Sequence, residues 1–578
     1  MWRGRYFRGS RFGAFAALLV LAFSLKIAVG LHGTFDILFD DETIYLDAAQ
    51  HFHDRFPAVA LAWSSPLYPM WYRFVGLFEH DPLKVYFLGW FLLTVSLPIA
   101  LYFLARRSGA PVLSALAVSI LWALSSAPMT WPFVTKFATL LLALGAIAST
   151  YARDRRLAFS LSSVTLSTTA YVRPELLWPS IVLAGGVVVW CLVTVLQRYP
   201  PRRRTGGIAG AVLAVGTPFA LHTLFTRYEG QFGGGGDRGF YAFGQHYALN
   251  VVEARHLNVN PWTTWLPIAR EAFPKATTIM AAVMENPVAF AWHLKRNMML
   301  IPHALDAIIS PMGYQPIIIK WIGYAMLVMV IGRTFVTILR RRCAVFPRAL
   351  IGWSPLLFAM AFVVSGSSIL IHPRQHYVLP LIFLGLAAIA AGAGNDSGGR
   401  HTRFVDPVRG AGFLGLAVLL LAAIPTAQPN ALPSILQSRS RAQPEAEQEH
   451  RATIHALRKL GLSAPPWGPI PRQPSMVPVI LEPNYSRGVY AFFNFVCIEP
   501  WSKNIPFFEF LKKTGANIIV LNDHLKADVR LKDDPEFRMF VDGTGNREDF
   551  EMYPVAGTNV VLAIRRSVLQ WASPQETP

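Results

Sequence analysis

The chain has 578 residues, of which 53% are hydrophobic and only 15% are charged. Soluble domains carry about 25% charged residues, so this composition excludes an ordinary soluble protein and predicts one that crosses a membrane many times. The formal net charge is +19, from 53 Lys and Arg against 34 Asp and Glu. The basic residues form short clusters between apolar segments instead of one basic face, so we expect no nucleic-acid partner.

Apolar segments of spanning length follow one another along residues 1–427. They lie at approximately 12–31, 85–105, 111–128, 134–152, 157–172, 175–197, 208–226, 316–338, 350–371, 377–393 and 411–427. The first is longer than the apolar region of a signal peptide, so we interpret it as an uncleaved membrane helix. The segment at 157–172 and its neighbour also fit a re-entrant pair.

The basic clusters give this series of segments an orientation. With a cytoplasmic N-terminus, eleven crossings place every basic cluster on the cytoplasmic side, as the positive-inside rule requires. The sequence therefore predicts a multi-pass protein of the cell (inner) membrane. Two loops, 32–84 and 227–315, then lie on the opposite side of the membrane together with the C-terminal tail.

The tail has a different composition from the rest of the chain. Residues 428–449 are polar with several prolines and read as a linker. Within 450–578, short β-branched runs at 477–481, 517–521 and 559–564 predict strands, and 507–514 and 534–540 have helical spacing. The fold class that we expect is an all-α polytopic membrane protein of about 11 helices, with a small extracytoplasmic α/β domain at its C-terminus.

Three consecutive carboxylates, Asp40, Asp41 and Glu42, follow the first apolar segment. The next residues, 44–52, have helical spacing, so the carboxylates fall at a helix N-terminus, where the helix dipole favours negative charge. One interpretation is a helix cap in a solvated loop. One carboxylate would suffice for a cap, however, and three adjacent ones repel one another. A general base with a helper, or a divalent-cation site, accounts for all three better.

These residues and their neighbours resemble a known family. Asp41-Glu42, Tyr45 and Ser65-Pro66-Leu67-Tyr68-Pro69 are similar to the first extracytoplasmic loop of the GT-C integral-membrane glycosyltransferases, in the branch of the protein O-mannosyltransferases and aminoarabinose transferases. Arg173-Pro174-Glu175 and the segment 373–380 look like later pieces of the same family. The second of these departs from the family pattern by Gln375-His376 after Arg374. The resemblance covers approximately residues 1–395.

The resemblance implies an inverting sugar transfer at the outer membrane face, from a polyprenyl-phosphate donor to a glycan, lipid or protein acceptor. Asp41 would be the general base, and Glu42 would position Asp41 or the acceptor. The cations that would offset the donor phosphate are Arg173, Arg374 and Lys136, each of which could instead be an interfacial anchor. The residues expected to contact substrate are Asp40, Tyr45, Tyr68 and His376. The resemblance implies no certain cofactor, although Asp40, Asp41 and Glu42 could together hold a divalent metal ion.

Three other functions fit part of the sequence. A ligase that moves a preassembled glycan from its lipid carrier would have a similar donor site. A lipid or sugar transporter would be expected to show charged or broken helices near mid-bilayer, whereas the ionisable residues here concentrate at helix ends. A membrane scaffold would leave the acidic cluster without a role.

Overall fold

The structure is a computed structural model of the chain. It describes residues 10–31, 36–37, 41–51, 66–152, 154–196, 201–226, 236–262, 264–310, 315, 317–340, 348–394, 407–426, 449–462, 477–483, 487–492, 495–545, 547 and 549–572. The side chains of Asp41 and of several helix-end residues are outside this set.

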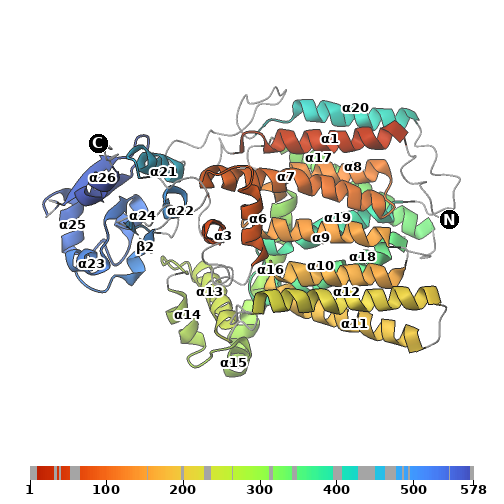
Figure 1. The fold of residues 1–578 in the computed structure, drawn as a ribbon, viewed down its shortest axis with the longest axis horizontal. Coiled ribbons are helices and arrows are strands. Elements are labelled where there is room, and N and C mark those ends of the chain that lie inside the picture. The colour runs from red at the N-terminus through yellow and green to blue at the C-terminus, as the bar shows by residue number, and fades with distance from the viewer. Residues whose placement is uncertain are drawn as a thin grey trace, which may run out of the picture.

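A bundle of long helices forms the larger part of the described chain (Figure 1). Each of the eleven predicted apolar segments is helical. The bundle helices are α1 (Ser10–Ala28), α7 (Pro82–Arg107), α8 (Val112–Leu124), α9 (Val134–Tyr151), α10 (Arg155–Ala170), α11 (Leu177–Leu196), α12 (Pro201–Thr226), α17 (Ile317–Arg340), α18 (Arg348–Leu370), α19 (Gln375–Gly392) and α20 (Pro407–Ala423).

Six of the described helices are long and apolar enough to cross a membrane: Pro82–Arg107, Val134–Tyr151, Pro174–Val193, Ile317–Thr337, Leu350–Leu370 and Gln375–Gly392. Parts of α1, α8, α12 and α20 are apolar but shorter. The chain therefore contains several helices that could span a bilayer, as its composition predicts. Many of their large apolar side chains, such as Trp178 and Phe362, point outward, as expected where the surrounding medium is apolar.

Helix α10 is rich in Ser and Thr and packs against α9, α11, α12 and α18. Small residues allow this close approach. A side chain at Gly145 of α9 would collide with Thr165, and one at Gly210 of α12 would collide with Ser160. Hydroxyls on α10 donate to carbonyls one turn earlier, as Thr165 does to Leu161. Small residues and satisfied hydroxyls are typical of helix contacts inside membrane bundles. The segment predicted at 157–172 thus falls on α10, Arg155–Ala170, which packs among four other helices of the bundle.

Shorter helices gather at the end of the bundle that lies away from the start of α1 (Figure 1). They are α3 (Asp41–Gln50), α6 (Leu67–Val75), α13 (Gly236–Arg255), α14 (Trp265–Ala272) and α15 (Ile279–Glu285), with the longer α16 (Pro287–Ile309) beside them. At the opposite end, the Trp353 indole donates to Ser108 and Gly394 approaches Gly109. One end of the bundle thus carries a cluster of short helices, and the other carries tight turns.

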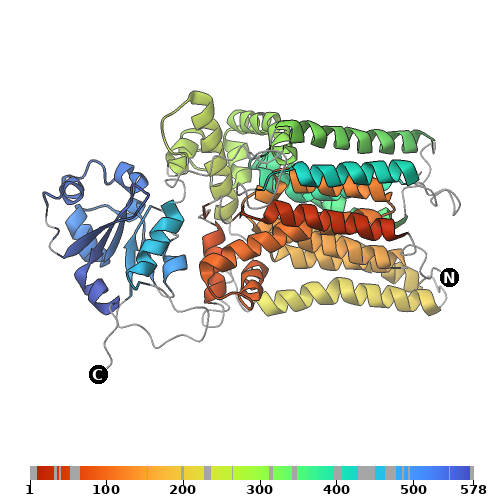
Figure 2. The same ribbon diagram turned by 90° about the horizontal axis from the view of Figure 1, so that it is seen from above.

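A separate α/β lobe lies beyond the short helices in both views (Figure 2). Its strands are β1 (Val479–Leu481), β2 (Val496–Ile498), β3 (Ile518–Leu521), β4 (Phe550–Pro554) and β5 (Val561–Arg565), and its helices are α21 (Glu449–Lys459), α22 (Arg487–Ala491), α23 (Phe507–Thr514), α24 (Asp523–Ala527), α25 (Pro535–Asp542) and α26 (Arg566–Ala572). The three predicted strands and two predicted helices are confirmed, whereas β2 and β4 were not predicted.

The sheet order is β2-β1-β3-β5-β4, with β1 parallel to β2 and β3 and with β5 antiparallel to β3 and β4. Successive side chains of β3 point to opposite faces of the sheet, and both sets are buried. Ile518 and Val520 pack with residues of α21 and α26, while Ile519 and Leu521 pack with residues of α23, α24 and α25. A strand buried on both faces gives a continuous apolar run, which is why this strand could be predicted.

Candidate active site

Helix α3 carries the acidic motif and begins at Asp41. Acidic residues in a first turn suit the partial positive charge of a helix N-terminus, and the rest of the helix contains no Gly or Pro. Asp40 and the side chain of Asp41 lie outside the described residues. Glu42, by contrast, is described and fully buried.

The Glu42 carboxylate accepts three hydrogen bonds from the protein. The Tyr68 and Tyr72 hydroxyls donate to Oε2 at 2.7 and 2.6 Å, and the Val134 amide donates to Oε1 at 3.1 Å. Burial raises the pKa of Glu42 to about 7, against the opposing effect of these donors. The carboxylate thereby joins the start of α3 to α6 and to the first turn of α9.

The two tyrosines lie four residues apart on the same face of α6. Tyr68 was predicted as a substrate contact, whereas Tyr72 was not predicted. The Tyr45 ring lies edge-on against the Tyr68 ring, with centroids 4.9 Å apart. Tyr45 and Tyr68 are both buried, so together they form a wall beside Glu42.

Lys136 is fully buried in the first turn of α9. Its ammonium donates to the Pro128 carbonyl and lies 4.6 Å from the centroid of the Phe133 ring. It lies two residues along α9 from Val134, whose amide donates to Glu42. Lys136 is absent from the lining of the cavity described next, so the structure places it in the protein interior as a neighbour of Glu42.

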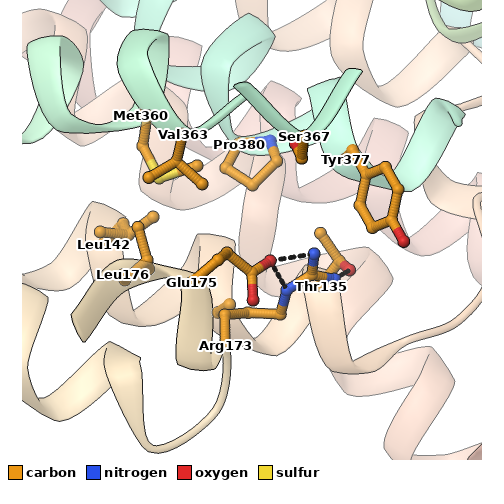
Figure 3. A pocket seen from close by; sticks show the side chains of 11 residues that line it. Thr135, Leu142, Arg173, Glu175, Leu176, Met360, Val363, Ser367, Tyr377 and Pro380 are labelled. Atoms are coloured by element: carbon orange, nitrogen blue, oxygen red, sulfur yellow. Dashed lines mark hydrogen bonds and ion pairs between the residues drawn. The ribbon is translucent and has the colours of Figure 1, made fainter. Parts of the chain in front are cut away.

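Arg173 lies in the turn between α10 and α11 and reaches a small cavity (Figure 3). Its guanidinium pairs with the Glu175 carboxylate, with Nε 2.5 Å from Oε1, and donates to Thr135 Oγ1 at 2.7 Å. Burial lowers the pKa of Arg173, but the Glu175 carboxylate outweighs this and keeps that pKa above its usual value. The guanidinium is therefore charged.

The cavity has a polar side and an apolar side. Its lining comes from α9, the α10–α11 turn, α18 and α19 (Figure 3). The polar residues are Thr135, Arg173, Glu175, Ser367 and Tyr377, and the apolar ones are Ala138, Leu142, Leu176, Met360, Val363 and Pro380. The cavity has a volume of only about 10 Å³, which is room for about one water molecule.

Two successive residues of α9 connect the cavity to the acidic helix. Val134 donates its amide to Glu42, and Thr135 accepts from Arg173. The α6 helix is tied to the same place, because the Leu67 amide donates to the Tyr171 carbonyl at 3.2 Å. The structure thus brings together Glu42, Tyr45, Tyr68 and Arg173, which are far apart in the sequence.

The remaining predicted residues lie near the start of α19. Arg374 immediately precedes this helix, and its guanidinium lies 4.8 Å from the centroid of the Trp262 ring. Within the described part of the chain, no carboxylate is within ion-pair distance of Arg374. His376 is buried, and its ring lies against the ring of Tyr377, which lines the cavity. Neither Arg374 nor His376 lines the cavity itself.

A buried polar network fixes the turn that carries Arg374. Asn297 of α16 donates to the carbonyls of Ile369 and Ile371 at the end of α18. Asn250 of α13 in turn donates to Asn297 at 2.8 Å. Side-chain amides that donate to the last carbonyls of a helix hold that helix end in one place.

A metal site was one of the two predicted uses of the acidic motif. Among the side chains that the structure describes, no group of three or more His, Cys, Asp or Glu residues could hold a metal ion. This finding does not extend to Asp40 or to the Asp41 carboxylate. A scan of protein-family models finds no match to this chain, and a search of curated proteins finds none either.

Proposed function

We propose that this chain is a membrane glycosyltransferase that moves a sugar from a polyprenyl-phosphate donor to an acceptor at the outer face of the membrane. The observation that carries the proposal is the cavity of Arg173. It combines the Arg173–Glu175 ion pair with an apolar lining, and it lies one residue along α9 from the contact that anchors the acidic helix.

The donor's two parts match the two sides of this cavity. The phosphate would take the place beside Arg173, since a guanidinium fork binds phosphate oxygens well. The first isoprene units would lie against the apolar residues of α9, α18 and α19, which requires α18 and α19 to move apart from α9 when the donor binds. Arg374 would add positive charge nearby, while Lys136 would act through its effect on Glu42 and not by contact with the donor.

In the proposed reaction, Asp41 removes the proton from an acceptor hydroxyl or amine. The acceptor atom attacks the anomeric carbon from the face opposite the phosphate, so its configuration inverts. The bond from that carbon to the phosphate oxygen breaks, and the electron pair leaves with the polyprenyl phosphate, whose charge Arg173 offsets. Glu42 holds the first turn of α3 against α6 and α9, which supports a positioning role toward Asp41.

The arrangement of the bundle supports the expected orientation in the membrane. Arg106 and Arg107 end α7, and Arg155 begins α10, at the end of the bundle away from the lobe. Placing that end in the cytoplasm satisfies the positive-inside rule and puts Glu42 and Arg173 at the outer surface. Under this proposal the eleven bundle helices all cross the inner membrane, the N-terminus is cytoplasmic, and the lobe is extracytoplasmic.

The test is an assay in membranes that contain the full chain, with a panel of radiolabelled polyprenyl-phosphate sugars and one lipid-linked preassembled glycan. We expect one monosaccharide donor to be consumed by the wild type. Asp41→Asn should lower the rate by about a hundredfold or more, since general bases contribute on that scale. Asp533→Asn is the matched control, because Asp533 is exposed in the lobe.

Consumption of no donor, or transfer by Asp41→Asn at the wild-type rate, would refute the proposal. Consumption of the preassembled glycan alone would support the ligase instead. A chelator added to the same assay decides whether the acidic motif holds a cation, because a metal-dependent enzyme loses its rate and a metal-free one keeps it.

A further inference from the structure

The C-terminal lobe contacts the same helix α3 that carries the acidic motif. Gln50, the last residue of α3, donates through Nε2 to the Val489 carbonyl of α22 at 3.0 Å, and this contact is buried. Val489 and Tyr490 of α22, together with Ile454 of α21, are buried in the hydrophobic cluster of the helix bundle. The rest of the lobe's core forms two clusters of its own. Helices α21 and α22 are therefore the docking face of the lobe.

Two carboxylates of the first loop hold α21 at its two ends. Asp36 accepts from the backbone amides of His450 and Arg451, at 2.9 and 3.2 Å, and so caps the N-terminus of a helix more than 400 residues away in the chain. Near the other end, the Arg458 guanidinium donates to both oxygens of Asp81, at 2.7 and 2.9 Å. A bidentate pair of this kind fixes orientation as well as distance.

Arg458 also joins the two helices of the docking face. It donates to the Tyr490 carbonyl at 2.7 Å. Asp81 also caps the N-terminus of α7, where it accepts a hydrogen bond from the Leu83 amide. Arg458 thus contacts both Asp81, which caps α7, and α22, the helix that contacts α3.

Behind the docking face, buried polar contacts fix α21 and α22 to the sheet. Arg487 of α22, almost fully buried, pairs with Glu482 at the end of β1 and with Glu449 of α21, at 3.1 and 2.8 Å. Asn522, which follows β3, also donates to Glu449 at 2.8 Å. Because Arg487 and Glu482 are buried, their ion pair restricts α22 to one position relative to β1. The lobe therefore presents a rigid face to α3.

Helix α3 has only ten residues, and a helix of this length is not stable in water without tertiary contacts. Glu42 anchors its first turn to the bundle, and the lobe anchors its last residue. We infer that the C-terminal lobe is a positioning element for the acidic helix and that Arg458 is the residue that keeps it docked. The docking stands without the proposed transferase activity, and only its consequence for turnover rests on that function.

Undocking the lobe should affect donor binding and the chemical step differently. The cavity of Arg173 is lined by bundle residues alone, so undocking the lobe leaves donor binding in place. The acidic helix loses an anchor, so the chemical step slows. Breaking the Arg458 pair should lower kcat and leave the donor KM unchanged, whereas a general loss of folded protein would lower the number of active sites and spare kcat per folded site.

The first experiment is hydrogen exchange of the full chain in lipid nanodiscs, read at the amides of α3. Arg458→Ala should speed exchange by about tenfold or more, because a charged hydrogen-bonded contact of this size is lost. Arg458→Lys keeps the charge without the bidentate geometry and should give an intermediate rate. The matched control is Arg538→Ala, which removes an exposed Arg–Asp pair of the same lobe.

The second experiment tests the docking by itself. A protease site placed in residues 428–448 is cut after folding, and the retention of the lobe on the bundle is measured. The lobe should stay bound in the wild type and in Arg538→Ala and should dissociate in Arg458→Ala. Equal exchange of α3 in Arg458→Ala and the wild type would overturn the inference, and so would loss of the wild-type lobe on cutting. Wild-type membranes that consume no donor would refute the transferase proposal and leave both of these readouts intact.

Discussion

The two charged groups that α9 holds side by side differ in what surrounds them. Glu42 is fully enclosed, and three neutral protein donors occupy its oxygens. Arg173 is partly exposed, pairs with a carboxylate that is itself partly exposed, and faces a cavity. A buried group whose hydrogen-bond partners all belong to the protein stabilises the fold, whereas a charged group at a cavity can bind a ligand. These contacts favour a structural role for Glu42, and under the proposed function they leave Arg173 as the group that can contact the donor.

Removal of the enclosed carboxylate should have the largest effect on stability. Glu42→Ala leaves the Tyr72 hydroxyl and the Val134 amide buried without an acceptor and leaves Tyr68 with only its 3.4 Å contact to the Tyr72 hydroxyl, so we expect a loss of about 3 kcal/mol or more in the free energy of unfolding. Glu175→Ala, at the partly exposed pair, should cost about 1 kcal/mol or less. Thermal unfolding of both variants in the same detergent checks the difference, and equal losses would contradict the comparison.

Removal of the cavity cation should act on binding instead. Arg173→Gln deletes the positive charge but keeps hydrogen-bonding groups, so we expect the donor KM to rise by about tenfold with little change in melting temperature. Arg255→Gln is the matched control, since Arg255 forms an exposed pair with Glu271 on the short helices. An unchanged donor KM in Arg173→Gln would remove the cavity from the proposed site.

Many helices and strands could be predicted from the sequence, whereas the contacts between them could not. Residues 507–514 were predicted as a helix and form α23, because periodicity is a local property. Strand β2 has three residues and an exposed Val496 at its start, so it has no local signature. Tyr72 and Arg458 find their partners 30 and 377 residues away, and no spacing rule connects such positions.

A smaller effect separates the three donors around Glu42. Tyr72→Phe removes one hydroxyl and keeps the ring, while Tyr68 and Val134 still donate to the carboxylate. We expect a loss of about 1 kcal/mol in the free energy of unfolding. Tyr241→Phe, at a half-exposed tyrosine of α13, should change stability by much less. A Tyr72→Phe loss as large as that of Glu42→Ala would show that this one bond carries the whole anchor.

Stability should also depend on pH. The pKa of Glu42 is about 7 in the folded chain and about 4.5 when unperturbed, so the folded chain binds this proton more tightly. The resulting stabilisation is fully present below pH 4.5 and is lost as the pH rises through about 7. The wild type should therefore lose more stability than Glu42→Gln between these values, and parallel melting curves for the two proteins would contradict the assignment.

In the proposed site, donor binding and sugar transfer depend on different residues, and a single-turnover measurement separates these two steps. Wild type and Asp41→Asn are loaded with the donor that the panel identifies, acceptor is added, and the release of polyprenyl phosphate is followed. We expect equal donor loading in both proteins and a release rate about a hundredfold or more lower in Asp41→Asn. Release at the wild-type rate from Asp41→Asn, or failure of that variant to load donor, would contradict this expectation.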